Sequence, residues 1–408
     1  MDTTTIPVTG VEELDLHLDQ LMRDSSLALD AKLFDHVQLQ LTESNIPPLI
    51  PLLLPKLVAI LQQDDRDPAL PASLATRLLS PVTFTQSLTL ASEESLIHAL
   101  SSPEPSVNLL AMTVLEKAAR TADDAALLAD MPQLFAELLR RWLLSPHAQV
   151  GAKGRRVLGD LLDTDSELPP LPPPPPSTGQ AQGGQDQVLA DMVKRRVPGR
   201  GKLWRLLFRT REPYQLLVDI CSGRHPGTAP ADGHQLSLAQ GRLLDILPRL
   251  AVLDFHAVAA SDFAAGRPTH ATNGGVDHDH DDDHEEPGPD QHQQRRGGGG
   301  QQHEGLLQFA ALRMVDRRDA LMHLNLVEFM EGFVSLMRVA PERSPYKVET
   351  LRALLRGATA DEDGGAALRA ALLGLPDRTV PEEADDLRLW LREVLPGEAV
   401  RVAGGHWG

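Results

Sequence analysis

The feature that most constrains the fold is a pattern that occurs twice, with equivalent residues 43 positions apart (residue 102 matches residue 145). Ser102–Val107 has the sequence Ser-Pro-Glu-Pro-Ser-Val, and Ser145–Val150 has the sequence Ser-Pro-His-Ala-Gln-Val. Serine caps helix N-termini and proline is tolerated in the first helical turn, so each segment predicts the start of a helix. Apolar residues follow at matching positions: Val114, Leu115 and Ala118 in the first copy, and Val157, Leu158 and Leu161 in the second.

The second copy shows how such a helix would pack. Its small and apolar residues recur with a helical period and so share one face: Val150, Gly154, Val157, Leu158 and Leu161. Gly154, which matches Ala111 in the first copy, would allow a neighbouring helix to approach closely. Only a following repeat could cover the apolar face that each unit leaves.

The spacing selects among helical repeats. Ankyrin and tetratricopeptide units are about 33–34 residues long, whereas HEAT and armadillo units have about 40–47. The composition agrees, because leucine and alanine dominate and aromatic residues make up only 4% of the chain. We therefore predict an all-α protein, an armadillo/HEAT-type α-solenoid.

The C-terminal part has less regular signals of the same kind. Asn325 and Glu328 form a possible capping box, and Thr379 and Glu382 form another, whose helix would end at Pro396-Gly397. Between them, Ser344-Pro345 predicts a helix start, with the helix closed by Gly357. Apolar residues follow each signal at helical spacing.

Two low-complexity stretches interrupt the helical pattern. Seven of the eight residues from Pro169 to Pro176 are proline, and Asp277–Asp290 contains eight acidic residues and no basic one. Neither composition can bury enough apolar surface to order itself. The predicted organisation is thus helical repeats at 11–165, a Pro/Gln-rich linker at 166–187, middle repeats at 188–263, a disordered insertion at 264–304 and C-terminal repeats at 305–398.

Charge and cysteine content narrow the setting. A net charge of −18 argues against a surface that grips nucleic acid or anionic lipid as a whole, and the single cysteine, Cys221, fits a reducing compartment. Residues Met1–Glu13 show no secretory signal, and the apolar run Leu49–Leu61 is too short and too broken by proline to span a bilayer. We expect a soluble cytoplasmic protein without a membrane partner, with the nucleus as a second compartment.

Candidate chemistry is sparse. His278, His280 and His284 lie among aspartates, but a useful metal site needs a fixed surrounding that a disordered segment lacks. Cys221 falls at a predicted helix C-terminus, where the helix dipole disfavours a thiolate. No catalytic motif is present, so we expect no metal, no cofactor and no enzymatic activity.

The segment Lys194–Arg211 carries eight basic residues and no acidic one, with Trp204 and Phe208 between them. Three interpretations remain open: a nucleic-acid contact through bases stacked on aromatics, a solvated amphipathic helix, or a basic patch for an acidic protein, with Lys202 and Arg205 as candidate contacts. The sequence Gly199–Lys202 does not satisfy the phosphate-loop pattern.

Three stretches resemble a family of proteasome assembly chaperones. This family includes the animal 26S proteasome non-ATPase regulatory subunit 5 and a fungal counterpart with a historical DNA mismatch repair name. The paired repeats in Leu96–Asp163, the segment Gly199–Arg205 with Tyr214–Ser222, and Phe309–Leu395 carry the likeness.

The resemblance implies a C-shaped solenoid that binds the C-terminal domain of a proteasomal ATPase subunit during assembly of the regulatory-particle base. A nucleic-acid-associated repair factor and a general armadillo scaffold for another client are the alternatives. The exposed side of the repeat helices would face the partner, which gives Thr113 and Lys117 in the first copy and Arg156 and Asp160 in the second.

Overall fold

The computed structural model describes residues 8–24, 26–62, 67–167, 198–228, 233–261, 263, 303–340, 343–360 and 364–395. These residues are almost entirely helical, which confirms the all-α prediction. The N-terminal helices are α1 (Val11–Arg23), α2 (Ala31–Gln40), η1 (Pro47–Leu49), α3 (Ile50–Leu61), α4 (Ala69–Leu78), α5 (Phe84–Leu90), α6 (Glu93–Ser101), α7 (Pro105–Glu116), η2 (Lys117–Arg120), α8 (Ala122–Ala129), α9 (Pro132–Leu144) and α10 (Ala148–Thr164).

After residue 198 the described elements continue with the same character. They are α12 (Lys202–Arg209), α13 (Arg211–Cys221), η3 (Pro226–Thr228), α14 (Gly233–Leu253), α15 (Phe255–Ala259), β1 (Ala260–Ser261), β2 (His303–Glu304), α16 (Leu306–Leu312), α17 (Ala320–Val339), α18 (Pro345–Thr359), α19 (Gly365–Gly374), η4 (Pro376–Arg378) and α20 (Pro381–Val394). The two short strands pair antiparallel.

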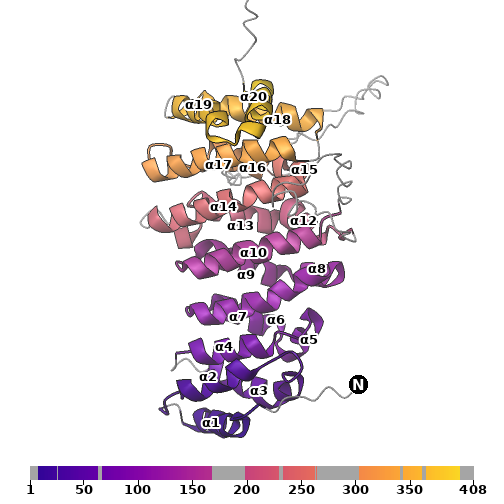
Figure 1. Ribbon diagram of the computed structural model, residues 1–408, viewed down its shortest axis with the longest axis vertical. Coiled ribbons are helices and arrows are strands. Elements are labelled where there is room, and N and C mark those ends of the chain that lie inside the picture. Colours follow the sequence, from indigo (N-terminus) through magenta and orange to yellow (C-terminus); the bar gives the residue numbers. More distant parts are fainter. Residues whose placement is uncertain are drawn as a thin grey trace, which may run out of the picture.

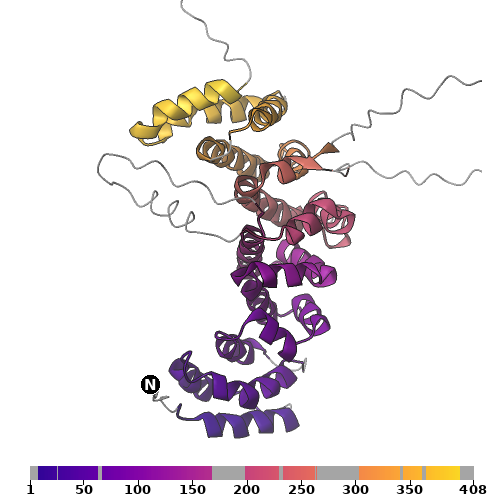
Figure 2. The same cartoon turned by 90° about the vertical axis from the view of Figure 1, so that its right-hand side faces the viewer.

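The helices are stacked along the long axis of the molecule, from α1 at one end to α20 at the other (Figure 1). Helices that are consecutive in the chain, such as α6 with α7 and α9 with α10, pack as pairs. Within the stack α4, α7, α10, α14 and α17 each contact the next, and we call these five helices the inner row. The stack bends, and the inner row lies on its concave side (Figure 2).

The apolar face predicted for the second copy is buried. Val150, Val157, Leu158 and Leu161 are at most 1% exposed. Gly154 lies against α9, because a Cβ atom at this position would be 2.8 Å from the Cβ atom of Trp142. The predicted close approach at Gly154 is therefore confirmed.

The serines of the repeated segment have a different role from the one predicted. The helices begin at Pro105 and Ala148, and neither has a side-chain N-cap. Ser102 and Ser145 instead follow the ends of α6 and α9, where each hydroxyl accepts a hydrogen bond from the backbone N–H two residues further on, at 3.2 Å. The serine N-cap prediction was wrong by two residues, since Glu104 and His147 are the N-cap residues, and serine also stabilises turns of this kind.

The start of α17 is also displaced from the prediction. The Asp319 carboxylate accepts hydrogen bonds from the N–H groups of Leu321 and Met322 at 2.9 and 3.2 Å, so the helix begins at Ala320. Asn325 and Glu328 consequently lie inside the helix. The capping box predicted for them was wrong.

The last two predicted helices, α18 and α20, are both present, and the predicted N-cap is correct for α18 alone. Ser344 caps α18 by accepting the N–H of Lys347 at 3.3 Å, as predicted, although the helix continues past Gly357 to Thr359. The capping box at Thr379 and Glu382 was wrong, since Val380 is the N-cap residue of α20 and makes no side-chain cap. The predicted apolar face of α20 is buried: Leu387, Trp390, Leu391 and Val394.

Helix C-termini in the stack are closed by side chains from neighbouring helices. The amide of Asn108 on α7 donates to the carbonyls of Ala99, Leu100 and Ser102 at the end of α6, at 2.9, 3.1 and 3.0 Å. These carbonyls have no partner within their own helix, so leaving them unsatisfied in the core would be costly.

The same carbonyls in the second copy receive a different donor. Trp142 and Leu143, which are 43 residues after Ala99 and Leu100, accept hydrogen bonds from Nη1 of Arg242 at 2.8 and 3.1 Å. Arg242 belongs to α14, the next helix of the inner row. The two copies thus satisfy one structural need from two different positions.

The predicted insertions lie largely outside the described residues, including the proline run and Asp277–Asp290. Their predicted boundaries include four residues that the structure describes. Ser166 accepts a hydrogen bond from the N–H of Gly199 at 2.7 Å, and His303–Glu304 form strand β2. The structure thus describes the first two residues of the predicted linker and the last two of the predicted insertion.

Among the described residues, α17 is the one helix that is long and apolar enough to cross a membrane by length and composition alone. One of its faces packs in the stack, where Leu326, Met330 and Phe333 are buried. A core helix passes the same test.

Candidate protein-binding groove

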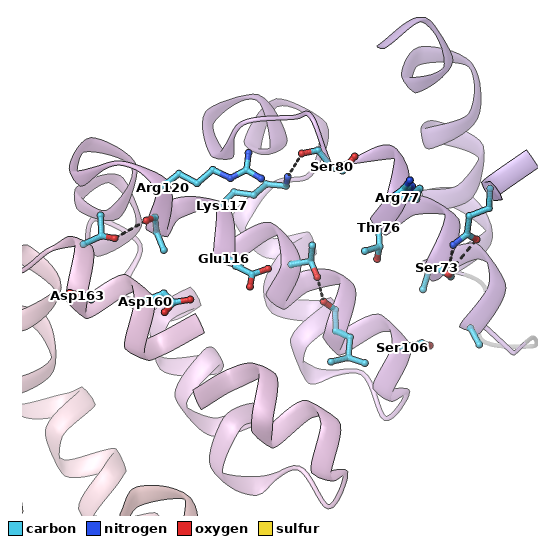
Figure 3. A pocket seen from close by; sticks show the side chains of 17 residues that line it. Ser73, Thr76, Arg77, Ser80, Ser106, Glu116, Lys117, Arg120, Asp160 and Asp163 are labelled. Carbon is cyan, nitrogen blue, oxygen red and sulfur yellow. Dashed lines mark hydrogen bonds between the residues drawn. The ribbon is translucent and has the colours of Figure 1, made fainter. Parts of the chain in front are cut away.

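A groove of ≈ 830 Å³ lined by several charged side chains lies on the concave side, across α4, α7 with η2, and α10 (Figure 3). Three of the six residues predicted to contact a partner line it: Thr113, Lys117 and Asp160. Thr113 belongs to α7, Lys117 to η2, which continues from α7, and Asp160 to α10, which packs beside both. The equivalent faces of the two repeat copies therefore form one surface.

Lys117 is not the exposed contact that was predicted. Its side chain is 3% exposed, and its ammonium donates to the carbonyls of Leu79 and Val82 at 2.7 and 2.9 Å. Burial, together with the smaller effect of the nearby charge of Arg120, lowers the pKa of Lys117 to about 8. Lys117 forms the floor of the groove and closes the C-terminal end of α4.

Glu116 is the residue that links the helices, and the sequence reasoning missed it. Its carboxylate accepts from Lys153 at 2.5 Å and from Arg156 at 2.8 Å, both on α10. Burial would raise the pKa of Glu116, but the hydrogen bond and charge of Lys153 and the charge of Arg156 lower it below its usual value. The sequence did contain a signal for this link. Glu116 lies about one helical turn after Thr113, and the basic residues Lys153 and Arg156 follow it by 37 and 40 positions, close to the repeat offset.

The other predicted residues of the two copies differ in exposure. Thr113 is half-buried, and its hydroxyl donates to the carbonyl of Leu109 at 2.8 Å. Arg156 is 61% exposed and stands at the rim of the groove through its ion pair with Glu116. Asp160 is half-buried and pairs with Arg249 of α14 at 2.8 Å.

A second groove of ≈ 670 Å³ continues along the inner row, between α10 and α14. It is lined by Lys153, Arg155, Arg156 and Arg249, with Asp245 as its acidic residue. Arg155 pairs with Asp245 at 2.5 Å. Ion pairs thus connect α7, α10 and α14 in sequence along the concave side.

Lys202 and Arg205 lie outside both grooves. They belong to α12, where Lys202 pairs with Asp130 at 3.0 Å and Arg205 pairs with Glu167 at 2.6 Å. The aromatic residues of this helix face inward. Trp204 and Phe208 are 7% and 3% exposed and stack on each other with ring centroids 5.3 Å apart.

Asp165 explains why α12 begins where it does. Its buried carboxylate accepts from the N–H groups of Leu203 and Trp204 at 2.6 and 3.3 Å. Burial raises the pKa of Asp165, against the effect of these hydrogen bonds. Gly201, at φ +62°, lets the chain turn around this carboxylate, which gives the Gly199–Lys202 segment a structural role.

The remaining chemical candidates offer no site in the part of the chain that the structure describes. Cys221 is completely buried, and burial raises the pKa of its thiol. No group of three metal-ligating side chains occurs among the described residues, and His278, His280 and His284 lie outside them.

No known family model matches this chain, and a search of curated proteins finds no similar sequence.

Proposed function

We propose that this chain is an armadillo/HEAT-type α-solenoid that binds another protein on its concave side. The 43-residue offset supports this proposal, because it relates α6 with α7 to α9 with α10 and extends to the carbonyls that Asn108 and Arg242 satisfy. Stacked helical repeats create extended concave surfaces of the kind that hold partner domains.

The proposed activity is that of a chaperone for the regulatory-particle base of the 26S proteasome. It would hold the C-terminal domain of one proteasomal ATPase subunit until assembly displaces it. The single observation that carries the binding function is the groove across α4, α7 and α10, which brings together Thr113, Lys117 and Asp160, predicted contact residues of both repeat copies. The choice of an ATPase as the client rests on the family resemblance.

The experiment is affinity purification of the tagged full chain from cells, followed by quantitative mass spectrometry. The proposal expects base ATPase subunits to be enriched and 20S core subunits to be nearly absent. Arg156→Glu should reduce that recovery, whereas Arg356→Glu, on the exposed side of α18, should leave it unchanged. Enrichment of an unrelated client would support a general scaffold, and mature proteasomes would contradict the chaperone role.

The nucleic-acid alternative has less support. Trp204 and Phe208 are packed in the core, so they cannot stack on bases, and Lys202 and Arg205 are ion-paired. A gel-shift titration against duplex DNA tests it directly. If DNA were the target, binding would weaken steeply with salt and on Arg205→Glu.

A further inference from the structure

The two grooves of the concave side share an unusual charge balance for this protein. Seven cationic side chains line them: Arg77, Lys117, Arg120, Lys153, Arg155, Arg156 and Arg249. Four acidic side chains accompany them: Glu116, Asp160, Asp163 and Asp245. Seven minus four leaves an excess of three cations, whereas the whole chain has a net charge of −18.

The first groove contains three basic and three acidic side chains, and the second contains four basic and one acidic. The acids of the first groove, however, pair with cations that line the second groove, so the cations without an acidic partner are those of the first. Arg77 donates to the carbonyl of Leu41 at 2.9 Å, and Lys117 donates to the carbonyls that close α4. Arg120 is exposed and forms no ion pair with any described residue. None of the three has a carboxylate partner within the part of the chain that the structure describes. The four cations of the second groove, by contrast, are all ion-paired.

We infer that the concave side binds an acidic segment of a protein partner, whose carboxylates contact Arg77 and Arg120 while the segment runs toward Arg155 and Arg156. This inference rests on the proposed protein-binding function and specifies the chemistry of the bound element. The exposed ion pairs of Arg155 and Arg156 can exchange partners at little cost, because surface pairs contribute little individually. The segment therefore gains contacts at one end without a large loss at the other.

The dimensions define the segment. Neighbouring helices of a stack lie about 8–10 Å apart, so the path from α4 across α7 and α10 to α14 is about 25–30 Å long. An extended segment of about nine residues or a helix of about eighteen covers that distance.

The pattern of charges favours an acidic protein segment over a nucleic acid. Glu116 on α7 and Asp160 and Asp163 on α10 lie between the cations, so the uniform negative charge of a phosphate backbone would meet acidic side chains on both helices. Among the described residues, no aromatic side chain lines either groove to stack on a base. A peptide can place acidic residues opposite the cations and neutral ones opposite the acids.

The test uses the full chain and three labelled probes in fluorescence anisotropy. The probes are a twelve-residue peptide of alternating glutamate and alanine, its lysine–alanine counterpart, and a twelve-nucleotide single strand of DNA. The acidic peptide should bind, weaken with added salt, and lose about tenfold in affinity with the double variant Arg77→Glu/Arg120→Glu. Arg356→Glu is the matched control, since it also reverses an exposed arginine in the last turn of a helix, and should change affinity by less than about twofold.

Several outcomes would overturn the inference: equal binding of the lysine peptide, tighter binding of the DNA strand, or an acidic-peptide affinity that the double variant leaves unchanged. Arg77 also supports the end of α2, so thermal melting must accompany the double variant. If the melting temperature of the double variant falls, the single variant Arg120→Glu is the deciding test. The Arg120 side chain contacts no described carbonyl or acid, unlike Arg77. Arg120→Glu should still lower the affinity for the acidic peptide about threefold.

The inference and the proposed function fail separately. If purification recovers no ATPase while the acidic peptide still requires Arg120, the chaperone proposal is wrong and the inference stands. If ATPases are recovered equally by the wild type and by Arg120→Glu, the client is held elsewhere and the inference alone is wrong.

Discussion

The guanidinium of Arg242 occupies the space that a side chain at Gly151 would fill. A Cβ atom at Gly151 would lie 2.4 Å from Nε of Arg242. Gly151 is the position equivalent to Asn108, 43 residues later, so the second repeat copy has lost the amide that closes the preceding helix and admits an arginine from α14 in its place. Residues at equivalent positions of the two copies therefore have different structural roles.

Gly151→Ala should destabilise the protein. The added methyl group displaces the Arg242 side chain from the carbonyls of Trp142 and Leu143, and we expect a loss of about 1–3 kcal/mol in the free energy of unfolding. Urea denaturation measures it. Gly241→Ala is the control on α14, where a Cβ atom meets nothing within 4 Å. It should raise stability by about 0.5–1 kcal/mol, as expected of alanine inside a helix.

The double variant Gly151→Asn/Arg242→Ala tests whether the two solutions are equivalent. It recreates at residue 151 the donor that residue 108 provides, without the arginine that would clash with it. Its stability should exceed that of Arg242→Ala alone. Equal stabilities would mean that an amide at residue 151 cannot reach the end of α9.

Asn108→Ala should lower the free energy of unfolding by about 2–3 kcal/mol, because three carbonyls at the end of α6 lose their donor in a site that is 0% exposed. Asn108→Asp should cost more, since a carboxylate would face those oxygens. Thermal melting followed by circular dichroism reports both. Asn325→Ala on α17 should be close to neutral, as the one hydrogen bond of the Asn325 amide within the described part of the chain goes to the sulfur of Met322 at 3.8 Å.

Lys117 should make stability depend on pH in the alkaline range. Its pKa is about 8 in the folded protein and 10.5 in the unfolded chain, so the unfolded state binds more protons between these values. Its contribution to stability therefore rises from pH 8 to pH 10.5, by up to about 3 kcal/mol. The difference in unfolding free energy between wild type and Lys117→Met, measured at both ends of this range, isolates it. If the wild type instead loses stability relative to Lys117→Met as the pH rises, the hydrogen bonds to the carbonyls of Leu79 and Val82 raise the pKa of Lys117 more than burial lowers it.

Variants along α10 should separate folding from binding. Val157→Asp buries an unpaired charge at a 0% exposed site and should cost at least about 3 kcal/mol. Arg156→Glu removes one exposed ion pair and should change stability by about 1 kcal/mol at most while reducing client recovery. Asp160→Arg would face Arg249 and should lower the melting temperature as well, so it is unsuitable as a binding variant.

The periodic features of the fold could be predicted from sequence. The buried face of α10, the tight contact at Gly154 and the Ser344 cap of α18 all follow from local spacing, and each is confirmed. Helix starts were less predictable. Asp319 captures the first turn of α17 six residues before Asn325, and nothing local decides between two acceptable caps in one apolar run.

The sequence placed three of the predicted contact residues correctly on one surface, and their role in binding stays a prediction. Thr113, Lys117 and Asp160 do line one groove, because equivalent positions of stacked helices face the same way. The burial of Lys117 depends on acceptors 35 and 38 residues away, which no helical pattern identifies. Lys202 and Arg205 could not be placed by charge alone, since their acidic partners Asp130 and Glu167 come from elements folded beside α12.

The closure of helix ends by neighbouring layers limits how such a chain can grow. A unit copied with Asn108 would need a following helix that keeps its distance from that amide, whereas a unit copied with Gly151 would need one that supplies an arginine. Inserting a further copy between α10 and α14 would separate Arg242 from the carbonyls of Trp142 and Leu143. Lengthening this molecule by gene duplication, or by design, therefore requires paired changes on both sides of each junction.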